Sequence, residues 1–197
     1  MPKFRVVLAE HGYRDVQIER DIIEAAGGEL DDCHGQPIEQ VLEACRDADA
    51  ILVRRIQFTP ERIAALRKCK TIVRYGVGVD NVDLPTATKA GIIVGHVPVY
   101  CQDEVSTQAI ALLLACIRTV VSTHDKLRAG GWDVHANEPV YRAAGKTLGI
   151  VGLGTLGQAV ATKLQNWNLR LIAADPFVDP EIASRLNVQL IPFDSLL

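Results

Sequence analysis

The chain has 197 residues, of which 48% are hydrophobic and 23% are charged, and its formal net charge is −3 at pH 7. This balance is typical of a globular protein and atypical of disordered or fibrous chains. The slightly negative charge provides no overall attraction to nucleic acid or to an anionic membrane, so we expect neither as a partner.

Membrane, secretion and disulfide classes are also disfavoured. The longest apolar run, Ala109–Ile117, has nine residues, about half of what a membrane span needs, and predicts a buried helix. The N-terminal stretch MPKFRVVLAE lacks the long apolar region of a secretory signal, so we expect a cytoplasmic protein. An odd number of cysteines with no C-x-x-C pair predicts buried free thiols and no metal site. These cysteines are Cys33, Cys45, Cys69, Cys101 and Cys116.

Short apolar runs alternate with helical patterns in the first half of the chain. Strands are expected at residues 5–9, 50–53, 71–76 and 92–97, and helices at 16–26, 59–69 and 84–91. Such alternation predicts a parallel sheet with helices on its faces. Thr59 followed by Pro60 is a typical helix start, and Gly91 lies where a helix is expected to end.

A different pattern begins at Gln102. Residues 103–127 contain no Pro or Gly, with Asp103 available as a cap, and predict one long, mostly buried helix. A loop rich in Gly, Pro and Asn follows at 128–146. A second alternating series then begins, with strands at 147–151, 169–174 and 188–191 and helices at 155–167, near 180–186 and from 193 onward.

The second series contains a G-x-G-x-x-G motif formed by Gly152, Gly154 and Gly157. A strand precedes the motif and a helix follows it, which is the context of a dinucleotide-binding turn. Gly152 provides the tight turn, Gly154 lets the backbone approach a pyrophosphate, and Gly157 lets the helix pack closely on the strand. The helix start at Thr155 and Leu156 presents unpaired amides to the phosphates.

Asp175 ends the next strand, at the position where a carboxylate accepts hydrogen bonds from the adenosine ribose. Its charge repels a 2′-phosphate, and no arginine follows in DPFVDP to bind one, so NAD is favoured over NADP. The alternative is that Asp175 only caps a turn before Pro176 and that the glycines only pack.

Three ordered blocks resemble the NAD-dependent D-isomer-specific 2-hydroxyacid dehydrogenases, which include D-3-phosphoglycerate dehydrogenases and the C-terminal binding protein corepressors. The blocks are RYGVGVDNVDLPTATKAGIIVGHVP, CQDEVSTQAIALLLA and GKTLGIVGLGTLG, the last followed by Asp175-Pro176. The resemblance extends from about Ala50 to the end of the sequence. It is specific to the superfamily but not to a substrate.

The resemblance implies an α/β protein with a flavodoxin-like substrate domain over residues 1–99. Residues 100–197 would form the N-terminal part of a Rossmann NAD-binding domain, with the remainder absent from the chain. It further implies that the backbone amides of Gly76, Val77 and Gly78 hold the carboxylate of a small 2-hydroxy or 2-keto acid. The long helix would lie between the subunits of a homodimer.

The sequence departs from the family pattern in its catalytic residues. Family members place a catalytic Arg, Glu and His after the glycine motif, whereas this sequence contains only Arg185 and no histidine beyond Asp175. The segment 133–139 matches the D-V-x-x-x-E-P pattern, but it precedes the glycine motif, so Glu138 is interpreted as a loop residue. His96 and His124 are interpreted as satisfied polar groups. No catalytic residue is therefore assigned.

Two further interpretations remain open. One is a non-catalytic NAD(H)-responsive binding module similar to the corepressors, and the other is a short remnant that packs against a full-length partner. The favoured interpretation is an oxidoreductase of the family, seen as an N-terminal portion that by itself turns over no substrate.

Overall fold

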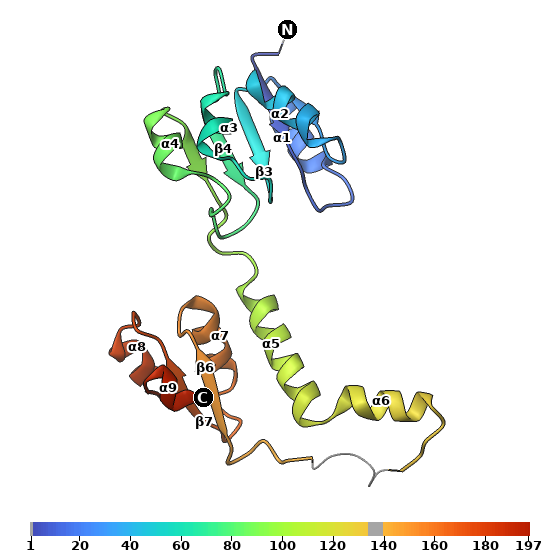
Figure 1. The fold of residues 1–197 in the computed structure, drawn as a ribbon, viewed down its shortest axis with the longest axis vertical. Helices are drawn as coiled ribbons and strands as arrows, with labels where there is room; N and C mark the ends of the chain where they lie inside the picture. Colours follow the sequence, from blue (N-terminus) through green and yellow to red (C-terminus); the bar gives the residue numbers. More distant parts are fainter. Residues whose placement is uncertain (1, 134–139) are drawn as a thin grey trace. The chain divides into compact units, whose positions relative to one another are not determined.

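The computed structural model describes residues 2–133 and 140–197, which divide into two compact units, Met1–Tyr100 and Cys101–Leu197 (Figure 1). Glu138 and its D-V-x-x-x-E-P segment from residue 134 onward lie outside the described residues. Each unit is an α/β structure with a parallel sheet of its own. The fold class predicted from the sequence is confirmed.

The first unit contains a five-stranded sheet in the order β2-β1-β3-β4-β5, with every neighbouring pair parallel. Its strands are β1 (Phe4–Leu8), β2 (Gly28–Asp32), β3 (Ala50–Val53), β4 (Thr71–Arg74) and β5 (Ile93–Gly95). This is the flavodoxin-like order, in which the direction of winding reverses between β1 and β3. Ligands of such sheets bind beyond the carboxyl ends of the strands near that reversal.

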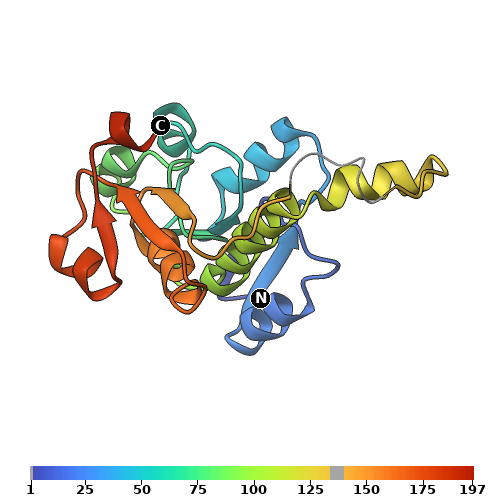
Figure 2. The ribbon, with the colours of Figure 1, turned by 90° about the horizontal axis from the view of Figure 1, so that it is seen from below.

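Helices cover both faces of this sheet. They are α1 (Gln17–Ala25), α2 (Ile38–Arg46), α3 (Pro60–Ala64) and α4 (Leu84–Lys89). One core cluster joins the sheet to Val41 and Ile63 of α2 and α3, and another joins the opposite face to Ile23 of α1. Figure 2 shows α1 and α2 on opposite sides of the neighbouring strands.

Strand β2 and helix α2 were not expected from the sequence. The β2 sequence GELDD has one buried residue, Leu30, and it pairs with β1 alone, so no run of apolar side chains marks it. Helix α2 buries Val41 and Cys45, and its sequence IEQVLEACR mixes apolar and charged residues. Helix α3 is also shorter than expected, ending at Ala64, and its N-cap Thr59 forms no side-chain capping bond. Gly91 has φ +71° directly after α4, as its role in ending a helix requires.

The second unit contains a three-stranded parallel sheet in the order β6-β7-β8. Its elements are β6 (Thr147–Val151), α7 (Thr155–Lys163), β7 (Arg170–Ala174), α8 (Pro180–Arg185), β8 (Val188–Leu190) and α9 (Phe193–Leu196). The fully buried Leu153, Ala161 and Ala173 join turn, helix and strand in one core. Helix α7 ends four residues before the expected Trp167, which is 37% exposed.

The prediction of one long, buried helix at 103–127 was wrong. Residues 102–128 form two helices, α5 (Gln102–Ile117) and α6 (Val120–Arg128), which meet at an angle of 59°. Thr119 adopts a left-handed conformation with φ 52° at the break, and no Gly or Pro announces it. The N-cap is Cys101 and not Asp103, and no residue of Ala109–Ile117 is buried.

The expectation of buried free thiols is met in part. Cys33, Cys45 and Cys69 are buried free thiols, whereas Cys101 is half-buried and Cys116 is exposed. No group of three or more His, Cys, Asp or Glu in the described ranges could hold a metal ion. Within the same ranges, no single helix is long and apolar enough to cross a bilayer. The bent pair α5 and α6 reaches that length and composition together.

Candidate functional site

The glycine turn between β6 and α7 is built as the motif predicts. Gly152 has φ +85°, which favours glycine, and its N–H donates to the Ala174 carbonyl at 2.9 Å. A side chain at Gly157 would overlap the Gly152 carbonyl oxygen, so only glycine lets α7 lie this close to the turn. Around Gly154, by contrast, no atom lies within 4 Å of a Cβ position. The turn is therefore packed on one side and open on the other.

The open side of the turn is the start of helix α7. Gly154 is the N-cap and no side chain caps the helix, so its first N–H groups are available to an anion. Within the described residues, the Gly154 N–H has no acceptor either. The predicted residues Thr155 and Leu156 form the first turn of this helix.

Leu153, the middle residue of the turn, is held at both of its backbone polar groups. Its N–H donates to Asp175 Oδ2 at 2.7 Å, and its carbonyl accepts from Gln158 Nε2 at 2.9 Å. Its side chain is fully buried in the core of the unit. Gln158 was not recognised from the sequence, because a polar residue in the first turn of a helix carries no signal of its own.

Asp175 lies at the end of β7 and faces the turn. Its Oδ1 accepts the N–H groups of Phe177 and Val178 at 2.8 and 3.0 Å. The bonds from Phe177 and then from Leu153 lower the pKa of this carboxyl group. Asp175 thus caps the turn before helix α8, as the alternative interpretation supposes, while the remaining lone pair of Oδ2 can accept another hydrogen bond.

A hollow of about 610 Å³ lies against the turn and Asp175. Its walls are mostly apolar, and Phe177 beside it is 93% exposed. It is lined by Val151, Gly152, Ala174, Asp175, Pro176, Phe177, Ile191, Pro192 and Phe193. A flat apolar group joined to a polar, anionic one would fit this combination of hollow, carboxylate and open helix start.

In the first unit, the predicted substrate loop follows β4. Gly76 is buried with φ +146°, which a residue with a side chain rarely adopts. The Val77 carbonyl faces His96 Nδ1 at 2.7 Å, so this imidazole nitrogen donates to it and His96 is a satisfied polar group. The Gly76 N–H, which was also predicted to hold the carboxylate, donates to the Arg74 carbonyl at 2.9 Å, whereas the N–H groups of Val77 and Gly78 have no acceptor in the part of the chain that the structure describes. These two amides can therefore bind an anion.

Two arginines at the ends of neighbouring strands were not recognised in the sequence. The Arg74 side chain lies beside this loop, whereas the Arg54 guanidinium lies against Gly12 in the loop after β1. Arg54 and Arg74 follow and end neighbouring strands, because β3 and β4 pair with Val53 opposite Arg74. Arg74 Nε donates to the Arg54 carbonyl at 3.2 Å, and a side chain at Gly76 would overlap the Arg74 guanidinium. Neither arginine forms an ion pair with a carboxylate of the described residues. The available signal was a basic residue at the carboxyl end of each of two strands, directly after β3 and as the last residue of β4.

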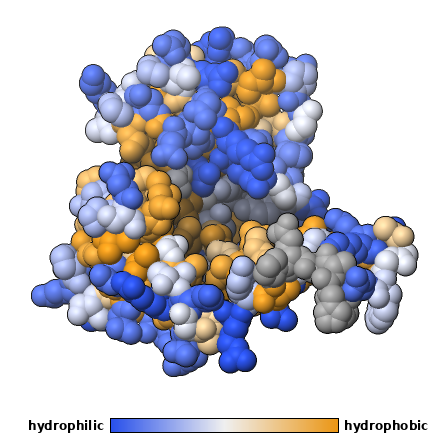
Figure 3. Space-filling view, turned by 60° about the horizontal axis from the view of Figure 1, so that its bottom comes forward, coloured by the Kyte–Doolittle hydropathy of each residue, from blue (hydrophilic) through white to orange (hydrophobic). Residues whose placement is uncertain are grey.

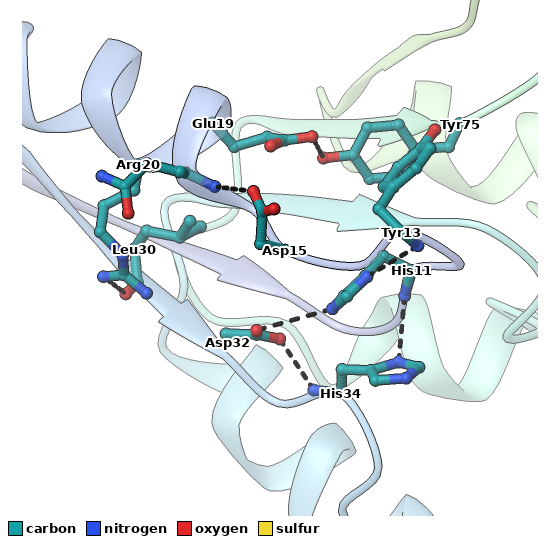
Figure 4. Close-up of polar contacts among 10 residues, drawn as sticks. His11, Tyr13, Asp15, Glu19, Arg20, Leu30, Asp32, His34 and Tyr75 are labelled. Carbon is teal, nitrogen blue, oxygen red and sulfur yellow. Dashed lines mark hydrogen bonds and ion pairs between the residues drawn. The ribbon is translucent and has the colours of Figure 1, made fainter.

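The loop after β1 is fixed against the strand end that leads into Gly76 (Figure 4). The Tyr13 ring packs edge-on against the Tyr75 ring, with 5.5 Å between the ring centroids. The Tyr75 hydroxyl donates a hydrogen bond to Glu19 Oε1 at 3.1 Å. Burial and then the Glu19 charge raise the Tyr75 pKa, so the phenol stays protonated. His11 accepts the Tyr13 N–H and lies 3.6 Å from Asp32. These contacts hold the loop after β1 next to the strand end that leads into the predicted substrate loop.

Comparisons with known proteins agree on one family. The chain matches the family model of the D-isomer specific 2-hydroxyacid dehydrogenase catalytic domain over residues 7–169. It is 39% identical over 159 residues to a D-3-phosphoglycerate dehydrogenase of Mycobacterium leprae, covering 80% of this chain and 30% of that protein. A second such dehydrogenase, from Methanocaldococcus jannaschii, is 35% identical, with 83% and 31% covered. The chain therefore spans about a third of the length of these curated relatives.

Solved structures give the same answer for the fold. A glyoxylate reductase from Paecilomyes thermophila matches with a TM-score of 0.82 and 27% identity, covering 100% of this chain and 62% of that one. A D-lactate dehydrogenase from Aquifex aeolicus, solved with NAD and lactic acid, has a TM-score of 0.82 at 20% identity, with 98% and 57% covered. These matches include the first 50 residues, for which the sequence blocks gave no resemblance.

Proposed function

Because the chain belongs to the D-isomer specific 2-hydroxyacid dehydrogenase family, we propose that each of its two units binds one of the two reactants of an oxidoreductase. The first, residues 1–99, holds the carboxylate of a small 2-hydroxy or 2-keto acid. The second, residues 100–197, holds NAD, which accepts or donates the hydride in such reactions. The family assignment made from the sequence blocks is confirmed, while these roles of the units are proposals.

The single observation that carries the proposal is the glycine turn with Asp175. Gly152 needs glycine because of its positive φ, and Gly157 needs glycine because a side chain would overlap the Gly152 carbonyl oxygen. Packing does not require glycine at Gly154, where the space for a side chain is open. A pyrophosphate in that space would accept N–H groups from Gly154, Thr155 and Leu156. The ribose would bind Asp175 Oδ2, and the adenine would lie in the hollow beside Pro176 and Phe177. The residues present therefore fit NAD.

The same carboxylate supports NAD over NADP. Asp175 is ionised at neutral pH because backbone N–H groups lower its pKa, and a 2′-phosphate at the ribose would be repelled by it. The first arginine after Asp175 in the sequence is Arg185, in the last turn of α8.

For the substrate, we propose an acid with a second anionic group. The amides of Val77 and Gly78 would hold the carboxylate, while the guanidiniums of Arg54 and Arg74 remain for another charge. Guanidinium groups without carboxylate partners favour phosphate or a second carboxylate, which they bind with charge-assisted hydrogen bonds. The name of the relatives, D-3-phosphoglycerate dehydrogenase, points to a phosphorylated acid.

The chain supplies binding and not proton transfer. Hydride transfer needs a base for the hydroxyl proton, and no catalytic residue is assigned here, because residues 176–197 contain no histidine and only one arginine, Arg185. We propose that the 197 residues alone do not turn over a 2-hydroxy acid. Neither the fold nor the relatives' names favour the alternatives of a corepressor-like module or a packing remnant.

Calorimetric titration of the chain with NAD and with NADP tests the proposal. We expect one saturable NAD site per chain and weaker NADP binding. Heats that do not saturate with NAD would contradict the assignment of the glycine turn as a cofactor site.

A further inference from the structure

Gln158 lies outside the glycine motif, yet its side chain reaches back to the turn. Its Nε2 donates to the Leu153 carbonyl at 2.9 Å, while its own N–H bonds the Gly154 carbonyl at 2.9 Å within helix α7. The side chain is therefore not needed to complete the helix. It is half-buried, so the bond is partly shielded from water.

The bond has a geometric consequence for the next residue. The peptide between Leu153 and Gly154 is trans and planar, so its C=O and N–H point in opposite directions. A donor that fixes the Leu153 carbonyl thereby fixes the Gly154 N–H on the other side, away from Gln158. That N–H has no acceptor in the described residues.

Without Gln158 this peptide could turn over. Gly154 has no Cβ, so a large change in its φ costs little, and the space around it is open. Asp175 holds the Leu153 N–H at 2.7 Å, but that group belongs to the preceding peptide. A reversed peptide would direct the Leu153 carbonyl oxygen where the Gly154 N–H now points, and a carbonyl oxygen repels an anion.

We propose that Gln158 is a positioning residue for the cofactor: by holding the Leu153 carbonyl it aims the Gly154 N–H at the pyrophosphate. This inference rests on the proposed NAD site and extends it to a residue that does not touch the ligand. Gln158 and Asp175 hold the two sides of Leu153, so both peptides of the turn are oriented before a ligand binds. Such preorganisation reduces the cost of binding.

The test replaces Gln158 by Met, which keeps the length of the side chain and adds no charge but cannot donate. The matched control is Gln165→Met. Gln165 Nε2 also donates to backbone carbonyls, those of Ala161 and Leu186 at 3.1 and 2.5 Å, at the far end of the helix. NAD and adenosine are titrated into both variants, because adenosine lacks the pyrophosphate.

We expect Gln158→Met to lower the affinity for NAD by about 3- to 10-fold, the range for one hydrogen bond. The affinity for adenosine should fall by less than about twofold. Gln165→Met should change neither. NAD affinity within about twofold of the unchanged protein would overturn the inference. So would an equal loss for NAD and adenosine, because Gln158 would then act through the fold of the whole unit.

A second readout needs no ligand. In ¹H–¹⁵N spectra of the free protein, the Gly154 amide should shift or double in Gln158→Met and stay unchanged in Gln165→Met. An unchanged Gly154 resonance in Gln158→Met would overturn the inference. If the unchanged protein binds no NAD, the proposed function fails, and this spectrum still decides whether Gln158 orients the peptide.

Discussion

At the scale of single residues, Asp175 combines two roles in one carboxylate. It caps the turn before α8, and in the proposed site it also faces the adenosine ribose. Three backbone N–H groups already bind it, from Leu153, Phe177 and Val178. The charge is therefore held in place before any ribose arrives, and the proposed preference for NAD depends on that charge more than on a free hydrogen-bonding site.

Asp175→Asn should narrow the preference for NAD over NADP by about fivefold or more, chiefly by improving NADP binding, because the repulsion of a 2′-phosphate disappears. The amide keeps one oxygen as acceptor, so the turn is disturbed less than by alanine. The ratio of the two dissociation constants is measured by calorimetry. Asp179→Asn is the control, since Asp179 caps α8 through the Glu181 N–H; an equal change in both variants would contradict the role of Asp175.

The buried thiols of the first unit should be unreactive, and the stability of this unit should fall as the pH becomes alkaline. Burial raises the pKa of Cys33 and Cys69 to about 11 and that of Cys45 to about 12, from an ordinary 9.0. Each raised pKa stabilises the fold fully below about pH 9, and this contribution is lost as the pH rises toward 11–12.

Iodoacetamide at pH 8 should therefore label the exposed Cys116 well before these three, as measured by mass spectrometry of peptides. Thermal midpoints should fall between pH 9 and 11. Labelling of Cys45 in the native protein at the rate of Cys116 would contradict the packing described here.

At the scale of elements, the three motif glycines serve different ends and should respond differently to alanine. Gly157→Ala places a methyl group against the Gly152 carbonyl oxygen, so we expect it to lower the free energy of unfolding by about 1–3 kcal/mol. Gly154→Ala has room, and should change that free energy by less than about 0.5 kcal/mol. Gly154→Ala should nevertheless lower the affinity for NAD, because its methyl group occupies the space proposed for the pyrophosphate.

Urea unfolding and NAD titration of both variants separate the two roles. A strongly destabilised Gly154→Ala, or a Gly154→Ala that binds NAD normally, would remove the reason for assigning this glycine to a ligand.

The elements also show what sequence patterns could and could not reveal. The strand, turn and helix of the glycine motif could be predicted because their geometry depends on residues near one another in the sequence, three glycines and an aspartate at fixed spacing. Strand β2 was missed because an edge strand with one buried residue, Leu30, needs no apolar run. The break at Thr119 was missed because its left-handed conformation has no Gly or Pro to announce it. Arg54 and Arg74 come together only through the pairing of β3 and β4, which sequence order alone does not give.

At the scale of the whole molecule, helices α5 and α6 expose apolar side chains that favour association. Leu112 and Val121 are 57% and 67% exposed. Figure 3 shows that patches of apolar residues reach the surface on the side facing the viewer. We expect a homodimer at micromolar concentration in sedimentation, and Leu112→Glu should shift it toward monomer. Ile22→Glu is the control, because the Ile22 side chain on α1 is 66% exposed and lies outside these two helices. A monomer in the unchanged protein would contradict the expectation.

The 197-residue chain should show no dehydrogenase activity with D-lactate, D-glycerate, D-3-phosphoglycerate or their keto acids. The loss of a general base alone costs about 10² to 10⁴ in rate, and substrate positioning over the nicotinamide is lost with it. Absorbance of NADH at 340 nm is followed with a full-length relative as positive control. Sustained turnover at the mass of this chain would require Glu138, together with His96 or His124, to be reconsidered as catalytic residues.

We propose two separate anion-binding sites in this chain that serve one reaction, and amide chemical-shift mapping with two ligands tests this assignment most directly. NAD should shift the amides of residues 152–157 and 174–178, whereas D-3-phosphoglycerate should shift those of Val77 and Gly78 and the guanidinium resonances of Arg54 and Arg74. If NAD left the amides of the glycine turn unshifted, or if the acid shifted the turn and not Val77 and Gly78, the two-site assignment would be contradicted.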